Sequence, residues 1–291
     1  MKQPFKQQSS LKKLGLALVL LALVVGCSRL KLGYQWADVF ILYQMDRYLD
    51  LNDTQEDQAT AQIDELLAWH RQEELPQYAA FIGQIKTEFQ EGLDLASMDR
   101  LFKGFEVIRN RLYHKILPEV ALWLEQLSPA QIEHLHVELN QENDELAEEI
   151  QEPAEELREK RVEKGIKNLE RWLGYLNSAQ ETQARQFFAS LPSTGAERLA
   201  FRQSSHQELF ALLSQPERAK GTLLQFLERQ WLGVYQREPR LPYHQKLYEN
   251  QQAYRTFLTD FAQTLEARQK ERFVHKIDLL IADLKELSDR N

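Results

Sequence analysis

One ten-residue string gathers most of the side chains that could do chemistry. It reads WHRQEELPQY and runs from residue 69 to residue 78. Its imidazole, His70, could act as a general base if a carboxylate oriented it, and its guanidinium, Arg71, could hold an anionic substrate. A phenol and an indole close the string at its two ends. The candidate interaction residues are therefore Trp69, His70, Arg71, Glu74 and Tyr78.

The same residues also fit an ordinary structural role. His70 continues the apolar helical stripe of residues 59–66, and a histidine in such a stripe is more often a core residue with a satisfied hydrogen bond. Arg71 is more simply explained by a local ion pair with Glu73 or Glu74 than by a substrate clamp. The structural interpretation is favoured, and no catalytic residue is assigned.

A second concentration of charge lies between residues 141 and 160. This stretch holds nine acidic and two basic residues, and its apolar residues are sparse. A helix this polar is expected to project into solvent. Its acids form either an ordinary solvated face or a docking arm for a basic partner or divalent cations. The acidic surface is assigned to Glu142, Glu145, Glu149 and Glu156.

The motifs of common catalytic and metal sites are absent. The sequence has no H-E-x-x-H, no G-x-S-x-G, no P-loop, no dinucleotide fingerprint and no D-x-D-x-D-G calcium loop. His134 and His136 are two residues apart, so on a helix they face different directions and cannot chelate one ion together. We therefore expect no metal, no cofactor and no enzymatic activity.

The N-terminus has the three parts of an export signal. Four lysines without an acid precede an apolar run from Leu14 to Val25, and the small Gly26 follows. This run is too short to cross a bilayer as a helix, which needs about 20 residues. Val24-Val25-Gly26-Cys27 resembles the lipobox of bacterial lipoproteins, in which the cysteine is lipidated and becomes the new N-terminus. We predict a lipoprotein signal peptide over residues 1–26.

Cys27 is the only cysteine in the chain, so it can form neither an internal disulfide nor a cysteine metal site. Palmitate and related acyl chains on Cys27 would make membrane anchoring effectively permanent. The alternative is a chance cysteine after an ordinary signal peptide. Ser28, rather than aspartate, would follow the lipidated residue. By resemblance to sorted lipoproteins, this favours the outer membrane, with the protein facing the periplasm.

The composition of the mature part is that of an acidic globular protein. Without residues 1–26, which carry four lysines and no acid, the chain has 32 basic and 44 acidic residues. This acidity argues against a nucleic-acid partner, which needs a basic face. The hydrophobic content of 43% and the many aromatic residues exclude disorder. The length allows one large domain or two small ones.

Hydrophobic spacing predicts an all-α fold, a multi-helix array of roughly ten amphipathic helices. Residues 36–47 follow the 3, 4, 7 spacing of such a helix. Asp53 and Glu56 have capping-box spacing, residues 128–131 form a capping box with proline at the first helical position, and residues 176–181 open a helix in the same way.

These three helix starts share the pattern Leu-x-x-x-Gln, at spacings too irregular for a solenoid. We interpret them as recurrent helix openings and as relics of a duplication. Residues 27–33 are expected to form a short lipidated tether. Residues 34–291 are expected to form one helical periplasmic domain, with a sub-boundary near residue 127.

Several of these features together resemble a known family. They are the lipobox, the Leu-x-x-x-Gln openings, WHRQEELPQY at 69–78 and KRVEKGIKNLERWLGYLNSAQ at 160–180. The chain is similar over its whole mature length to an uncharacterised family of proteobacterial lipoproteins, described as a domain of unknown function. The most specific pieces are WHR-x-x-x-LP-x-Y and RWLG-x-L-x-x-x-Q. The resemblance implies lipid anchoring and a helical body, but no activity, substrate or catalytic residue.

Three functions fit these observations. The favoured one is a non-catalytic interaction or scaffold protein of the envelope, which binds a protein partner and is anchored in the bilayer through Cys27. The second is a chaperone-like lipoprotein that embraces an exported client, which predicts an exposed concave apolar surface. The third is a cell-wall hydrolase that uses His70, Arg71 and Glu74, which predicts that these side chains meet in a cleft.

Overall fold

The computed structural model describes residues 27–215, 221–232 and 241–289, and the expected signal peptide over residues 1–26 lies outside this part. All regular secondary structure in the described residues is helical, which confirms the predicted all-α fold. None of the described helices combines the length and the apolar content that a membrane span requires.

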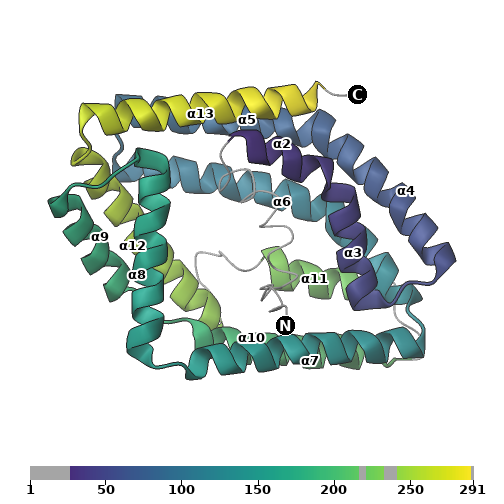
Figure 1. The fold of residues 1–291 in the computed structure, drawn as a ribbon. Helices are drawn as coiled ribbons and strands as arrows, with labels where there is room; N and C mark the ends of the chain where they lie inside the picture. The colour runs from purple at the N-terminus through teal and green to yellow at the C-terminus, as the bar shows by residue number, and fades with distance from the viewer. Residues whose placement is uncertain (1–26, 216–220, 233–240, 290–291) are drawn as a thin grey trace, which may run out of the picture.

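The helices are arranged as the sides of a closed frame (Figure 1). Helices α5 and α13 pack along one side, and α7 and α10 pack along the opposite side. The other two sides are formed by α3 with α4 and by α8, α9 and α12. The elements are α2 (Cys27–Gln35), α3 (Ala37–Leu49), α4 (Asp53–Trp69), the π-helical turn η1 (His70–Glu74), α5 (Leu75–Glu91), α6 (Leu95–Gln126), α7 (Pro129–Gln151), α8 (Ala154–Leu173), α9 (Ser178–Ser190), α10 (Gly195–Leu213), α11 (Thr222–Leu232), α12 (Pro242–Gln263) and α13 (Ala267–Ser288).

Capping boxes start several of these helices. Those at Ser128 and at Asn177 open α7 and α9 as predicted. The box of α4 differs from the predicted Asp53–Glu56 pair by one residue. Asn52 has the extended backbone of an N-cap, and its side chain accepts a hydrogen bond from the backbone N–H of Gln55 at 3.1 Å. The fold therefore uses the asparagine that precedes the aspartate.

The glutamines of two capping boxes also bind each other. The Nε2 group of Gln131 donates to Oε1 of Gln55 at 2.8 Å and to the backbone carbonyl of Asp50 at 3.1 Å. These bonds join the starts of α4 and α7 to the end of α3. A side chain that caps its own helix thus also fixes how three helices meet.

The same arrangement occurs a second time. A fourth Leu-x-x-x-Gln pattern, residues 265–269, which is not among the three predicted helix starts, opens α13 with Glu266 as the N-cap. The amides of Gln180 and Gln269 exchange hydrogen bonds of 2.9 and 2.8 Å, and both side chains are fully buried. Gln269 also donates to the carbonyl of Tyr175 at 2.8 Å, just as Gln131 donates to that of Asp50.

These two glutamine pairs belong to two similar halves of the chain, one from α3 to α7 and the other from α8 to α13. Helix α3 packs on α4 and α7, and α8 packs in the same way on α9 and α13. Both α3 and α8 end at a left-handed residue, Asp50 with φ 48° and Gly174 with φ 91°. The last helix of each half packs on the other half, α7 on α10 and α13 on α5. The fold therefore indicates an internal duplication whose halves interlock.

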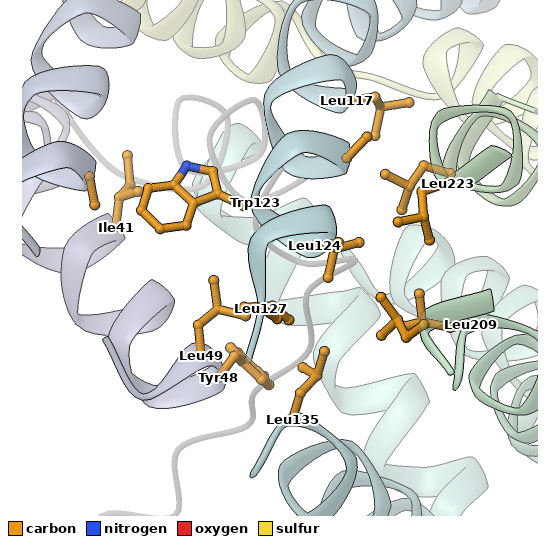
Figure 2. Packing of buried hydrophobic residues seen from close by; sticks show 14 of the residues in the cluster. Ile41, Tyr48, Leu49, Leu117, Trp123, Leu124, Leu127, Leu135, Leu209 and Leu223 are labelled. Carbon is orange, nitrogen blue, oxygen red and sulfur yellow. The ribbon is translucent and has the colours of Figure 1, made fainter. Parts of the chain in front are cut away.

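The hydrophobic core is divided into three buried clusters, one of which is drawn in Figure 2. In this cluster Trp123 of α6 lies beside Ile41 of α3, while Leu124 lies on the side toward Leu223 of α11. The indole N–H of Trp123 donates to the side chain of Gln62 at 2.7 Å. Helix α6 thus lies between α3 and α11 in this cluster.

Helix α3 forms where the 36–47 spacing predicts it, but its apolar face points outward. Trp36, Phe40 and Tyr43 are exposed. The face that packs on the core instead carries Ile41 and Tyr48, together with Ala37 and Gln44. Two faces of this helix are apolar, and spacing alone does not distinguish which of them is buried.

Candidate functional site

The WHRQEELPQY string contains an irregular turn. Between α4 and α5 the helix widens into the π-helical turn η1, in which the backbone N–H of Leu75 donates to the carbonyl of His70. Pro76 lies directly after this turn, has no N–H to donate and would crowd the carbonyl four residues before it in a regular α-helix. The wider turn accommodates this proline. Such π-turns occur frequently at functional sites.

His70 lies inside the protein and is only 3% exposed. Its Nδ1 atom is 3.0 Å from the hydroxyl of Tyr34, whose ring also stacks on the imidazole. The ring of Tyr78 meets the imidazole edge-on at a centroid distance of 5.4 Å. Burial lowers the pKa of His70 to about 4, and the positive charge of Arg71 acts in the same direction. The imidazole is therefore neutral at pH 7.

Glu74 is buried beside this histidine and has one charged partner. One guanidinium nitrogen of Arg111 in α6 is 2.9 Å from Oε1 of Glu74. Burial raises the pKa of the Glu74 carboxyl, and the ion pair with Arg111 opposes this rise. Burial also raises the pKa of Tyr34, to about 12, and that of Tyr78, where the charge of Glu74 adds to the effect. Both phenols keep their protons at neutral pH.

Three polar atoms of this cluster have no hydrogen-bond or ion-pair partner among the described residues. They are Nε2 of His70, Oε2 of Glu74 and the hydroxyl oxygen of Tyr78. A buried polar group without a partner costs about 1–3 kcal/mol. The cluster around the π-helical turn is therefore a place where the fold accepts a local cost in stability.

A shallow pocket of about 280 Å³ lies next to the buried cluster. Tyr34 connects the pocket to the buried cluster, because it lines the pocket and also contacts His70. Arg71, the residue that follows His70, lines the pocket as well. The lining combines one basic and two acidic side chains with apolar ones. It consists of Tyr34, Gln35, Asp38, Asp64, Leu67, Arg71 and Leu287. The volume lies at the small end of the range for ligand sites.

The structure divides the predicted interaction residues into two groups. His70, Glu74 and Tyr78 are buried, so in this structure they cannot touch a partner. Trp69 and Arg71 are partly exposed, and the ammonium group of Lys115 lies 5.6 Å from the Trp69 ring. The hydrolase hypothesis predicts that His70, Arg71 and Glu74 meet in an open cleft. The structure shows no such meeting, because His70 and Glu74 are buried.

The predicted ion pair between Arg71 and its neighbouring acids is replaced by one from another helix. Glu74 pairs with Arg111 of α6, and Arg71 faces the pocket. Sequence reasoning also missed Tyr34, the partner of His70. Arg111 and Tyr34 come from helices far from the string in sequence, and no local spacing connects them to it.

With the geometry established, comparison with known proteins places the chain in a family. Residues 47–236 match the model of DUF6279, a family of unknown function. The chain belongs to this family. The match spans the WHRQEELPQY string and Arg111 of this DUF6279 protein, while Tyr34 precedes it. No curated protein and no solved structure matches the chain.

The acidic surface of this DUF6279 protein is smaller than predicted. Glu145, Glu149 and Glu156 are exposed, but Glu142 is only 3% exposed. Its Oε2 atom is 2.6 Å from a guanidinium nitrogen of Arg202, and its Oε1 atom accepts a hydrogen bond from Tyr48. Helix α7 packs on α10 instead of projecting into solvent, so one of its faces is buried. Among the described residues no group of acids and histidines could hold a metal ion.

Proposed function

We propose that this protein is a lipid-anchored envelope protein that works by binding a protein partner rather than by catalysis. The observation that carries this proposal is the burial of His70 and Glu74, the groups of the candidate site best suited to acid–base chemistry. A general base must come within hydrogen-bond reach of a proton on the substrate. Neither side chain offers that reach to a cell-wall polymer.

In this proposal the membrane anchor is Cys27, which is lipidated after residues 1–26 have been removed. Helix α2 begins at Cys27, and Leu30 of the same helix is already buried in the core. The expected tether of residues 27–33 is therefore helical, and the folded body would lie against the membrane. The proposed membrane is the outer membrane, with the protein on its periplasmic side.

The proposed partner is a protein that binds to exposed charged side chains of this chain. Glu145 and Glu149 of α7 and Glu156 of α8 are exposed acids, and the pocket beside Arg71 presents mixed charge at another place. A basic protein fits the exposed acids, because opposite charges steer association and set its orientation.

A chaperone-like role is the second candidate. It is favoured by large apolar side chains that are exposed on helices away from the N-terminus. Val107 and Leu122 on α6 and Val137 on α7 are each about half exposed.

The experiment that tests the proposal is photo-crosslinking in intact cells. A photoreactive residue replaces Arg71, Glu145 or, as a control, the exposed apolar Val107. One dominant protein adduct from position 71 or 145 is the expected result. Many different adducts from position 107 would instead favour the chaperone-like role. The absence of protein adducts at all three positions would contradict both.

A further inference from the structure

The first two described helices expose an unusual amount of apolar surface. Five large side chains between residues 32 and 43 are 45% to 62% exposed. They are Leu32, Trp36, Val39, Phe40 and Tyr43. The three aromatic rings, each of about 150–250 Å², alone present on the order of 300 Å² to solvent. Apolar patches of this size on a protein surface usually mark a contact site.

Four of these side chains form one face at α3. Trp36, Val39, Phe40 and Tyr43 advance by three, one and three residues, which is the spacing of one side of a helix, while Leu32 lies on α2, before the turn at Trp36. The opposite side of α3 is buried against the rest of the fold through Ala37, Ile41 and Tyr48. We call residues 32, 36, 39, 40 and 43 the α2–α3 face.

The α2–α3 face is held rigidly next to Cys27. Leu30 is buried in the cluster that contains residues of α5 and α13, and Lys31 pairs with Asp283 of α13 at 3.1 Å. At a rise of about 1.5 Å per residue, Leu32 lies roughly 8 Å along α2 from Cys27, and α3 follows after the single turn residue Trp36. No flexible linker separates this face from the residue proposed to carry the lipid.

We propose that the α2–α3 face lies in the headgroup and acyl boundary of the membrane that holds Cys27, so that the protein has two membrane contacts. This inference rests on the proposed lipid anchor. Trp36 and Tyr43 carry amphipathic rings of the kind that collects at membrane–water interfaces. Val39 and Phe40 supply the apolar surface between them. An apolar helix face of this kind enters the boundary by about 5–10 Å.

Lipid is a better occupant for this face than another protein. The acyl chains on Cys27 would keep the face within reach of the bilayer at all times, so lipid is always present at high local concentration. All five side chains are uncharged, so binding should not require anionic lipids. Together, the anchor and the face would fix the side of the frame that is turned toward the membrane.

The test uses the full lipidated protein, purified and reconstituted into phosphatidylcholine vesicles. A new cysteine at position 39 is labelled with an environment-sensitive dye, and only this cysteine reacts because Cys27 is blocked by acylation. The matched control is Val137→Cys, since Val137 and Val39 are both valines with 54% exposure. Val137 lies on α7, on the side of the frame opposite α5 and α13, on which α2 packs (Figure 1).

A nitroxide-labelled lipid should quench the dye at position 39 at least about twofold more than the dye at position 137, because only the former enters the boundary. Water-soluble iodide should show the reverse order. Equal quenching at the two positions would overturn the inference. So would shielding of the dye at position 39 from both quenchers that is relieved when the protein in the vesicles is diluted about tenfold, which would assign the face to a second copy of the chain.

The mass of the N-terminal peptide is measured on the same sample. An acylated Cys27 with no lipid quenching at position 39 overturns only the second membrane contact. An unmodified Cys27 overturns both this inference and the proposed anchor.

Discussion

At the scale of single residues, the burial of His70 makes the stability of the fold depend on pH. Its pKa of about 4 in the folded protein lies below the ordinary value of 6.5, so the unfolded chain binds the additional proton first as the pH falls. We expect the free energy of unfolding to decrease between pH 6.5 and pH 4, by up to about 3 kcal/mol from this group. The raised pKa of Glu74 acts in the opposite direction and offsets part of this loss.

Urea unfolding at pH 7 and at pH 5 measures this dependence. His70→Gln should reduce the loss of stability between the two pH values. His275→Gln, which replaces an exposed histidine on α13, should leave it unchanged. A wild-type protein that is equally stable at both pH values, with the His70→Gln variant behaving in the same way, would contradict the burial of a neutral imidazole.

The ion pair between Glu142 and Arg202 gives a second prediction, because both side chains are buried. Arg202→Met leaves the Glu142 carboxylate in the interior without its charged partner. We expect this change to lower the free energy of unfolding by about 3–5 kcal/mol. Chemical denaturation of the purified variant measures the loss.

The matched control for this pair is Arg229→Met. Arg229 pairs with Glu208, and both side chains are about half exposed. The loss of an exposed pair should change the free energy of unfolding by less than about 1 kcal/mol. Equal effects of the two methionine substitutions would show that the Glu142 pair is not buried.

Residue-scale roles were predictable only where the signal is local. The helical stripe before His70 correctly suggested a core position. Its partner Tyr34 and the partner of Glu74, Arg111, come from other helices, so no spacing within the string could reveal them. Glu142 was assigned to the surface because its neighbours in sequence are acids, whereas its environment is set by α10.

At the scale of elements, the paired glutamines should contribute more than ordinary helix caps. Gln269 caps α13, bonds to Gln180 and bonds to the carbonyl of Tyr175. Gln269→Leu leaves these buried groups unpaired, so we expect a loss of about 2–4 kcal/mol in the free energy of unfolding. Urea unfolding of the single variants and of the double variant with Gln180→Leu measures the coupling between the two amides. Additive losses would contradict a direct bond.

Elements were predicted better than their faces. Helix starts followed from capping chemistry, and the one-residue error at α4 arose because Asn52 and Asp53 are both good N-caps. The start of α13 was missed because its N-cap, Glu266, is not one of the preferred residues. The outward direction of the α2–α3 face was not predictable, because α3 has two apolar faces and only tertiary contacts decide between them.

The last helix of each half, α7 or α13, packs on the other half. For the whole molecule we therefore expect the two halves to unfold together. Leu117 and Leu284 are fully buried and belong to different apolar clusters. Leu117→Ala and Leu284→Ala should each cost about 2–5 kcal/mol and shift one common thermal transition. Calorimetry compares the calorimetric and van't Hoff enthalpies of each variant. Two separate transitions, with only one of them shifted by each substitution, would contradict the interlocked arrangement.

The proposed function makes this helical DUF6279 protein a lipid-anchored binding protein of the envelope. The intact mass of the N-terminal peptide, from protein purified out of its native membranes, tests the proposed anchor. We expect a peptide that begins at Cys27 and carries acyl chains, and a Cys27→Ser variant without them. A peptide that retains residues before Cys27, or that begins at an unmodified residue, would show that the protein is not anchored in this way.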